Sequence, residues 1–139
     1  MTYSEGSIIV GGIDDGVIPD GELNNIPTYR DFRDTLFEGY KKAINVLNDN
    51  RFFVVMTGDS RDKNGAYYGC EAEHELFFRD QGLYIYNKIT YLECEFTRLA
   101  HAKRTLDYRK FPKREQKILV FYKGDMTKIK EIFPPIGRL

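Results

Sequence analysis

Apolar residues along the chain recur at two different spacings, which predict a mixture of helices and strands. Residues 28–47 place apolar side chains on one face at the helical period of about 3.6. Thr28, followed by Asp31, resembles a capping box, and the run 48–50 ends the helix. The residues of the apolar face are Tyr29, Phe32, Leu36, Tyr40, Ala43, Ile44 and Leu47.

Continuous apolar runs predict strands elsewhere in the chain. Phe52–Met56 shows no alternation of polar and apolar residues, which is typical of a strand covered on both faces. Leu83–Leu92 is rich in Tyr, Ile and Thr and predicts a long strand. Lys117–Tyr122 predicts another, and the short run Ser7–Val10, flanked by glycines, predicts a fourth.

Two further helices complete the pattern. One is predicted over Tyr67–Asp80, with Gly82 as its C′ residue, and a short one begins at Asp125 and ends before Pro134. This order of elements predicts an α/β fold with helices on a mostly parallel sheet. No clear crossover helix joins the last two strands, so we expect them to be antiparallel. The length predicts a single domain, 1–139.

The composition excludes several classes of protein. Hydrophobic residues make up 42% of the chain, which excludes general disorder. No apolar run approaches the roughly 18 residues of a membrane span, and no signal peptide is recognisable, so we expect a cytoplasmic protein without a membrane partner. Two cysteines exclude a disulfide framework.

Charge is balanced overall, with 21 basic and 21 acidic residues, but it is unevenly distributed. Residues 1–26 form an acidic, loop-rich segment, and residues 93–116 form a basic insertion suited to a phosphate backbone. Tyrosines beside the insertion suggest stacking on bases, although a solvated loop and core packing are the alternatives. Its candidate contacts are Lys103, Arg104, Arg109, Lys110, Lys113 and Arg114.

A second group of candidates lies in the loop after Phe52–Met56, where open α/β sheets bind ligands. Asp59, Arg61 and Asp62 follow Gly58 and offer carboxylates and a cation to a partner. The alternative is a turn held by aspartate side chains and an Asp–Arg pair.

Neither metal nor cofactor chemistry has a clear signature. Cys70 and His74 share one helix face, but two ligands do not make a metal site. No phosphate-binding loop or dinucleotide motif occurs. We therefore expect no resident metal or cofactor.

Two longer motifs carry a resemblance to a known family. They are GYKKAINVLNDNRFFVVMTGDSRDKNG (39–65) and ILVFYKGDMTKIK (118–130), with DQGLYIYNKI (80–89) between them. From about Tyr29 onward the chain resembles the C-terminal part of amino-group (adenine-specific) DNA methyltransferases of the phage and prophage type. The resemblance implies a partial Rossmann-like sheet of about four strands, of which the predicted strands after residue 50 are the last three.

The same resemblance implies a function through what is missing. The family's Asp-Pro-Pro-Tyr motif does not occur, and the corresponding place, after Ser7–Val10, reads Gly11-Gly12-Ile13-Asp14-Asp15. The glycine-rich motif that holds S-adenosylmethionine is missing too. We therefore expect a catalytically incomplete protein of a phage or mobile element. It would act by binding a host defence protein, as an anti-defence inhibitor, or DNA.

Two alternatives remain open. The chain is a subunit or remnant of an adenine DNA methyltransferase, active with S-adenosylmethionine in a complex, or it is a dimeric scaffold. A neighbouring reading frame with the missing motifs would favour the first. The second predicts a homodimer through an exposed edge strand, Ser7–Val10.

Overall fold

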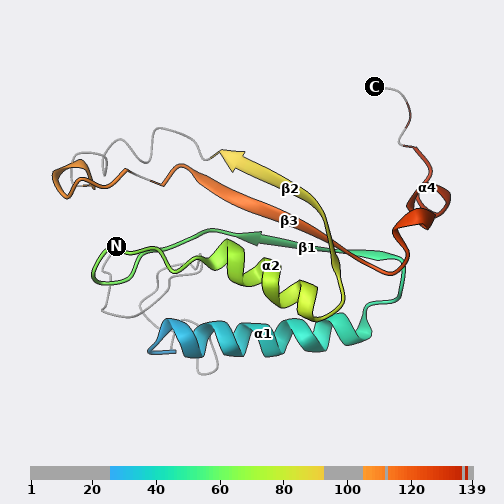
Figure 1. Ribbon diagram of the computed structural model, residues 1–139, viewed down its shortest axis with the longest axis horizontal. Coiled ribbons are helices and arrows are strands. Elements are labelled where there is room, and N and C mark those ends of the chain that lie inside the picture. The colour runs from blue at the N-terminus through green and yellow to red at the C-terminus, as the bar shows by residue number, and fades with distance from the viewer. Residues whose placement is uncertain (1–25, 93–104, 112, 136, 138–139) are drawn as a thin grey trace, which may run out of the picture. The chain divides into compact units, whose positions relative to one another are not determined.

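The computed structural model describes residues 26–92, 105–111, 113–135 and 137. Two units are present. One contains helix α1 and Arg61–Tyr68, and the other contains Asp49–Ser60 and the chain from Gly69 onward (Figure 1). Each unit is described by itself. The predicted strand Ser7–Val10 and residues 1–25 of the acidic segment lie outside the described residues.

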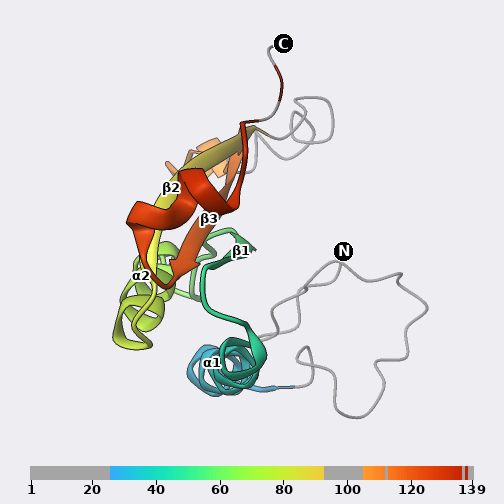
Figure 2. The same ribbon diagram turned by 90° about the vertical axis from the view of Figure 1, so that its right-hand side faces the viewer.

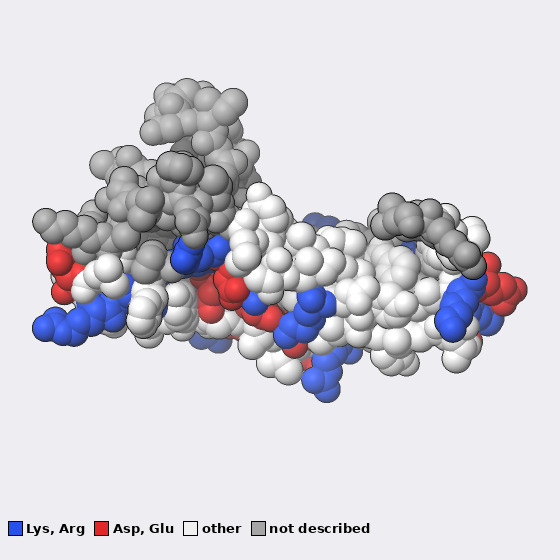
Figure 3. Space-filling model, turned by 90° about the horizontal axis from the view of Figure 1, so that it is seen from above, with Lys and Arg blue, Asp and Glu red and all other residues white. Residues whose placement is uncertain are grey.

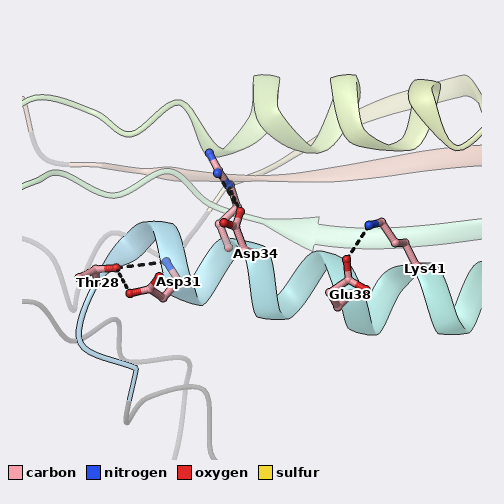
Figure 4. Close-up of polar contacts among 6 residues, drawn as sticks. Thr28, Asp31, Asp34, Glu38 and Lys41 are labelled. Carbon is pink, nitrogen blue, oxygen red and sulfur yellow. Dashed lines mark hydrogen bonds and ion pairs between the residues drawn. The ribbon is translucent and has the colours of Figure 1, made fainter.

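The predicted first helix is confirmed as α1 (Tyr29–Val46). Thr28 is its N-cap: the hydroxyl oxygen accepts a hydrogen bond from the Asp31 backbone N–H at 3.1 Å. The same hydroxyl donates to the Asp31 carboxylate at 2.6 Å (Figure 4). This exchange satisfies one of the free N–H groups at the helix start and places a negative charge in the first turn.

Three strands form one antiparallel sheet in the second unit. They are β1 (Arg51–Thr57), β2 (Tyr84–Leu92) and β3 (Glu115–Lys123), in the order β1-β3-β2. The antiparallel pairing of the last two strands is confirmed. The expectation of a mostly parallel sheet is wrong for the described strands, because β3 inserts between β1 and β2 and runs against both.

The second helix, α2 (Cys70–Asp80), begins later than predicted. Gly69 precedes it with a φ of 81°, a left-handed conformation that interrupts the helix upstream. The predicted C′ residue is confirmed: Gly82 has a φ of 82°, its N–H donates to the Arg79 carbonyl, and the next N–H donates to the Phe78 carbonyl. These two bonds form a Schellman motif.

Helix α2 packs on one face of the sheet (Figure 2). The Phe78 ring stacks on Phe121 with 4.1 Å between centroids and lies 5.0 Å from the Phe53 ring. Phe78, Leu119 and Phe121 are completely buried. On this side, aromatic side chains from two strands and a helix form the core. The prediction that the strand at 52–56 is covered on both faces is wrong, because Val54 and Met56 on the other face are 58% and 53% exposed.

A smaller aromatic cluster forms on the opposite face, near the start of β1. The Phe52 ring lies 5.0 Å from Tyr122, 5.3 Å from Tyr86 and 5.1 Å from Phe133. Phe133 follows helix α4 (Ile129–Ile132), which continues from η2 (Met126–Lys128). The cluster therefore fixes the C-terminal helical segment to the sheet. No helix in the described ranges is long and apolar enough to cross a membrane.

Candidate functional site

The first candidate residue, Asp59, caps helix α2. Its carboxylate accepts hydrogen bonds from the backbone N–H of Gly69, at 3.1 Å to each oxygen, and from that of Cys70 at 3.2 Å. It also accepts the Ser60 N–H at 2.9 Å. A carboxylate here meets N–H groups that lack partners within the helix and the positive end of the helix dipole. These bonds give Asp59 a structural role.

Arg61 and Asp62 hold a turn in the other unit. The Arg61 guanidinium lies 3.7 Å from the centroid of the Tyr67 ring and donates to the Gly65 carbonyl at 2.7 Å. The Asp62 carboxylate accepts the Ala66 N–H at 2.8 Å, and the Asp62 N–H donates to the Ala66 carbonyl. A turn held by an aspartate side chain was the alternative to a ligand site, but the Asp–Arg pair expected with it is not formed among the described residues. Ligand binding by either side chain stays a prediction.

One cation of the basic insertion reaches the loop after β1. A Cβ atom added to Gly58 would lie 2.1 Å from the Lys113 Nζ, so the ammonium group occupies the space beside the glycine. The structure thus brings together two segments that the sequence treated as separate candidates. Lys103 and Arg104 lie outside the described residues.

The described part of the insertion between β2 and β3 contains one helical turn with a defined end. Arg109 has a φ of 55°, and its N–H donates to the Leu106 carbonyl at 2.8 Å. The Lys110 N–H donates to the Thr105 carbonyl at 2.9 Å. This is again a Schellman motif, with arginine at the position that usually holds glycine. These two hydrogen bonds fix the backbone at Arg109 and Lys110 and so limit the directions in which their side chains and that of Phe111 can point.

Two aromatic side chains are exposed on this turn. Tyr108 is 68% exposed and Phe111 is 83% exposed. Arg109 and Lys110 stand between them in the sequence, and neither forms an ion pair with another described residue. We call residues 105–114 the basic tip, with position 112 not described. The sequence predicted the cations. Phe111 was missed, although its position between Lys110 and a proline, outside any apolar periodicity, was a usable signal.

The basic tip is continuous with β3, which places its last cation at the start of the sheet. Arg114 is exposed and Lys113 is half-buried, directly before β3 begins. Lys117, two residues into that strand, pairs with Glu115 at 3.0 Å and donates to the Thr90 hydroxyl at 3.0 Å. Lys117 is therefore engaged within the sheet and is not a member of the basic tip.

A charged cluster that the sequence did not reveal joins α2 to β2. The Lys88 ammonium lies 2.9 Å from the Glu71 carboxylate and 2.5 Å from that of Glu75. The hydrogen bonds that the Lys88 ammonium donates to Glu75 and then to Glu71 raise the pKa of Lys88. The two glutamates are one helical turn apart, so both face the same strand residue. The cluster is a structural contact between helix and sheet.

Cys70 and His74 are both buried on α2. The His74 Nδ1 is 2.7 Å from the Cys70 carbonyl oxygen, the bond of a side chain to the preceding helical turn. Burial lowers the pKa of His74, and the carbonyl bond and the charge of Glu73 partly oppose that effect. Within the part of the chain that the structure describes, no three His, Cys, Asp or Glu residues gather as metal ligands.

Comparison of the chain with protein-family models, with curated proteins and with solved structures found no match. The methyltransferase resemblance therefore stays a prediction based on the two sequence motifs.

Proposed function

We propose that this chain acts by binding single-stranded nucleic acid through the basic tip. The observation that carries the proposal is the exposure of Tyr108 and Phe111 on either side of Arg109 and Lys110. Because these two rings are exposed, they can contact a partner without leaving the protein core. Aromatic rings beside cations are the arrangement that stacks on bases while neutralising the backbone.

The balance of forces favours a single strand over a duplex. Stacking of a base on an aromatic ring contributes about 1–3 kcal/mol, and it needs a base face that is not already stacked on its neighbours. The cations add a term that depends on salt and not on sequence. The tip precedes the start of β3 (orange in Figure 1), and Tyr108 and Phe111 are both largely exposed there.

The proposal includes a methyltransferase-like origin for the sheet. The family resemblance assigns its last three strands to the segments that form β1, β2 and β3, and it expects the last two to be antiparallel. This agreement supports a partial Rossmann-like fold as part of the proposal. A role without catalysis, in a phage or against a host defence protein, stays a prediction from the missing motifs.

Fluorescence anisotropy with a labelled single-stranded oligonucleotide, its duplex and a salt series tests the proposal. The intact chain should bind the single strand more tightly than the duplex. Replacing both Tyr108 and Phe111 with Ala should weaken binding at least about tenfold and leave the salt slope unchanged. Arg109→Ala with Lys110→Ala should flatten the slope, by roughly 0.7 for each lost phosphate contact.

The matched control removes two exposed cations elsewhere, Lys128 and Lys130 in the η2–α4 segment. Equal weakening by this control would mean that affinity follows charge alone and would contradict a defined site. No binding at about 50 mM salt would reject the proposal, because the electrostatic attraction is strong there. Calorimetric titration of S-adenosylmethionine into the same sample tests the enzymatic alternative.

A further inference from the structure

One face of the sheet is apolar yet exposed beyond the aromatic cluster. By the strand register, this face carries the even-numbered residues of β1 and β3 and their partners in β2. Five of its large side chains, two from β1 and three from β2, are 49–58% exposed. They are Val54, Met56, Tyr84, Ile89 and Tyr91. Together with Ile118 and Val120, which lie between them in β3, we call them the open face.

The composition of the open face differs from that of an ordinary solvent-exposed sheet. Antiparallel sheets that face water on one side usually alternate apolar residues inside with polar residues outside. None of the seven positions of the open face carries a charge, and the two polar residues that the register adds to this face, Asn87 and Gln116, are uncharged as well. Figure 3 shows an expanse of surface without Lys, Arg, Asp or Glu on the side seen from above. The exposed side chains leave on the order of 500 Å² of apolar surface, as much as the largest patch of a typical monomer.

We propose that a second copy of this chain covers the open face, so that two sheets pack face to face. In a two-fold dimer each patch meets its own copy, so a charged patch would repel itself and an uncharged one does not. Two identical sheet faces interdigitate when their strands cross at about 30°. Ile118 and Val120, together with the neighbouring Tyr86 of the aromatic cluster, add to the surface that the dimer would cover. Two copies would then bury roughly 1,200 Å² in total, the lower end of a stable interface.

Charge also separates this surface from the basic tip. A nucleic acid or an acidic protein needs cations, and the open face has none among its defined residues. The tip, by contrast, carries Arg109 and Lys110 beside its aromatic residues. The dimer proposal therefore does not depend on the nucleic-acid proposal, and either can fail alone.

Sedimentation equilibrium of the full chain between about 1 and 100 µM tests the dimer. The intact chain should approach twice its mass of 16.3 kDa as concentration rises. Val54→Lys in β1 and Ile89→Lys in β2 should each weaken dimerisation at least about 100-fold, because each buries an unpaired charge at the interface. Both side chains are about half exposed in the single chain, so both variants should fold, as circular dichroism would verify.

Leu92→Lys is the matched control. Leu92 is a more exposed apolar residue of β2, and the register places it opposite Glu115, on the other face from Tyr91. This variant should dimerise like the intact chain. A monomer at 100 µM would overturn the proposal. So would a dimer that Val54→Lys disrupts and Ile89→Lys does not, because that result indicates pairing through the β1 edge instead of through the face.

Discussion

The Asp59 carboxylate accepts a hydrogen bond from the backbone N–H of Gly69, ten residues later in the sequence, at 3.1 Å to each of its two oxygens. The bond connects the end of β1 to the first turn of α2. A residue that the sequence presented as a candidate ligand contact thus has a structural function that depends on distant backbone geometry. Substitution of Asp59 distinguishes a structural role in capping α2 from a role in ligand binding.

Asp59→Ala should lower the free energy of unfolding by about 1–2 kcal/mol, because α2 loses its capping acceptor and the favourable charge at its N-terminus. Asp59→Asn keeps an acceptor oxygen and should lose less. Urea unfolding followed by circular dichroism measures both. An unchanged midpoint in Asp59→Ala, combined with weaker nucleic-acid binding, would restore the ligand interpretation.

Two glycines should respond to alanine in opposite directions. Gly124 has a φ of 118°, and a Cβ there would lie 2.7 Å from the Asn50 backbone nitrogen. Gly124→Ala should therefore destabilise the protein by about 2 kcal/mol or more. Gly39 lies inside α1 with nothing within 4 Å of an added Cβ, so Gly39→Ala should stabilise it by about 0.5–1 kcal/mol.

Thermal unfolding of the two variants gives the comparison directly. Asn50 explains why the Gly124 site is closed: its N–H donates to the Lys123 carbonyl at 2.7 Å, and its side-chain oxygen accepts the Asp125 N–H at 3.1 Å. A stable Gly124→Ala variant would mean that this turn rearranges without loss of the β1–β3 connection.

The pH dependence of stability should report on His74. Burial lowers its pKa in the folded protein, so the unfolded chain takes up the proton first as pH falls. Its contribution is fully present above the unfolded value of about 6.5 and decreases as pH falls below it. Urea midpoints between pH 7.5 and 5.5 should therefore decline, and His74→Gln should flatten that decline. An identical decline in the variant would assign the effect to other groups.

Local sequence signals predicted the elements better than their arrangement. The capping pair of Thr28 and Asp31 and the C′ glycine at Gly82 act within a few residues, so the sequence showed them directly. The insertion of β3 between β1 and β2 depends on long-range pairing that neither strand encodes alone. The left-handed conformation of Gly69 likewise displaced the start of α2.

The candidate site shows the same division. The cations of the basic tip were visible in the sequence, because charge needs no tertiary structure to be counted. Whether Tyr108 packs in a core or faces solvent is decided by the path of the chain between β2 and β3. The contacts of Asp59 and Arg61 also depend on loop closure, which their spacing alone did not reveal.

Arg109 offers a way to separate folding from binding in the basic tip. Its φ of 55° is a conformation that costs a non-glycine residue about 1 kcal/mol, and glycine adopts it freely. Arg109→Gly should thus raise the free energy of unfolding by up to about 1 kcal/mol and remove one phosphate contact. Parallel urea unfolding and anisotropy at several salt concentrations measure the two effects. Arg109→Ala is the control, since it loses the same charge without relieving the backbone. If Arg109→Gly were no more stable than Arg109→Ala, the left-handed turn would not be strained. If both kept the full salt slope, the side chain would not contact a phosphate.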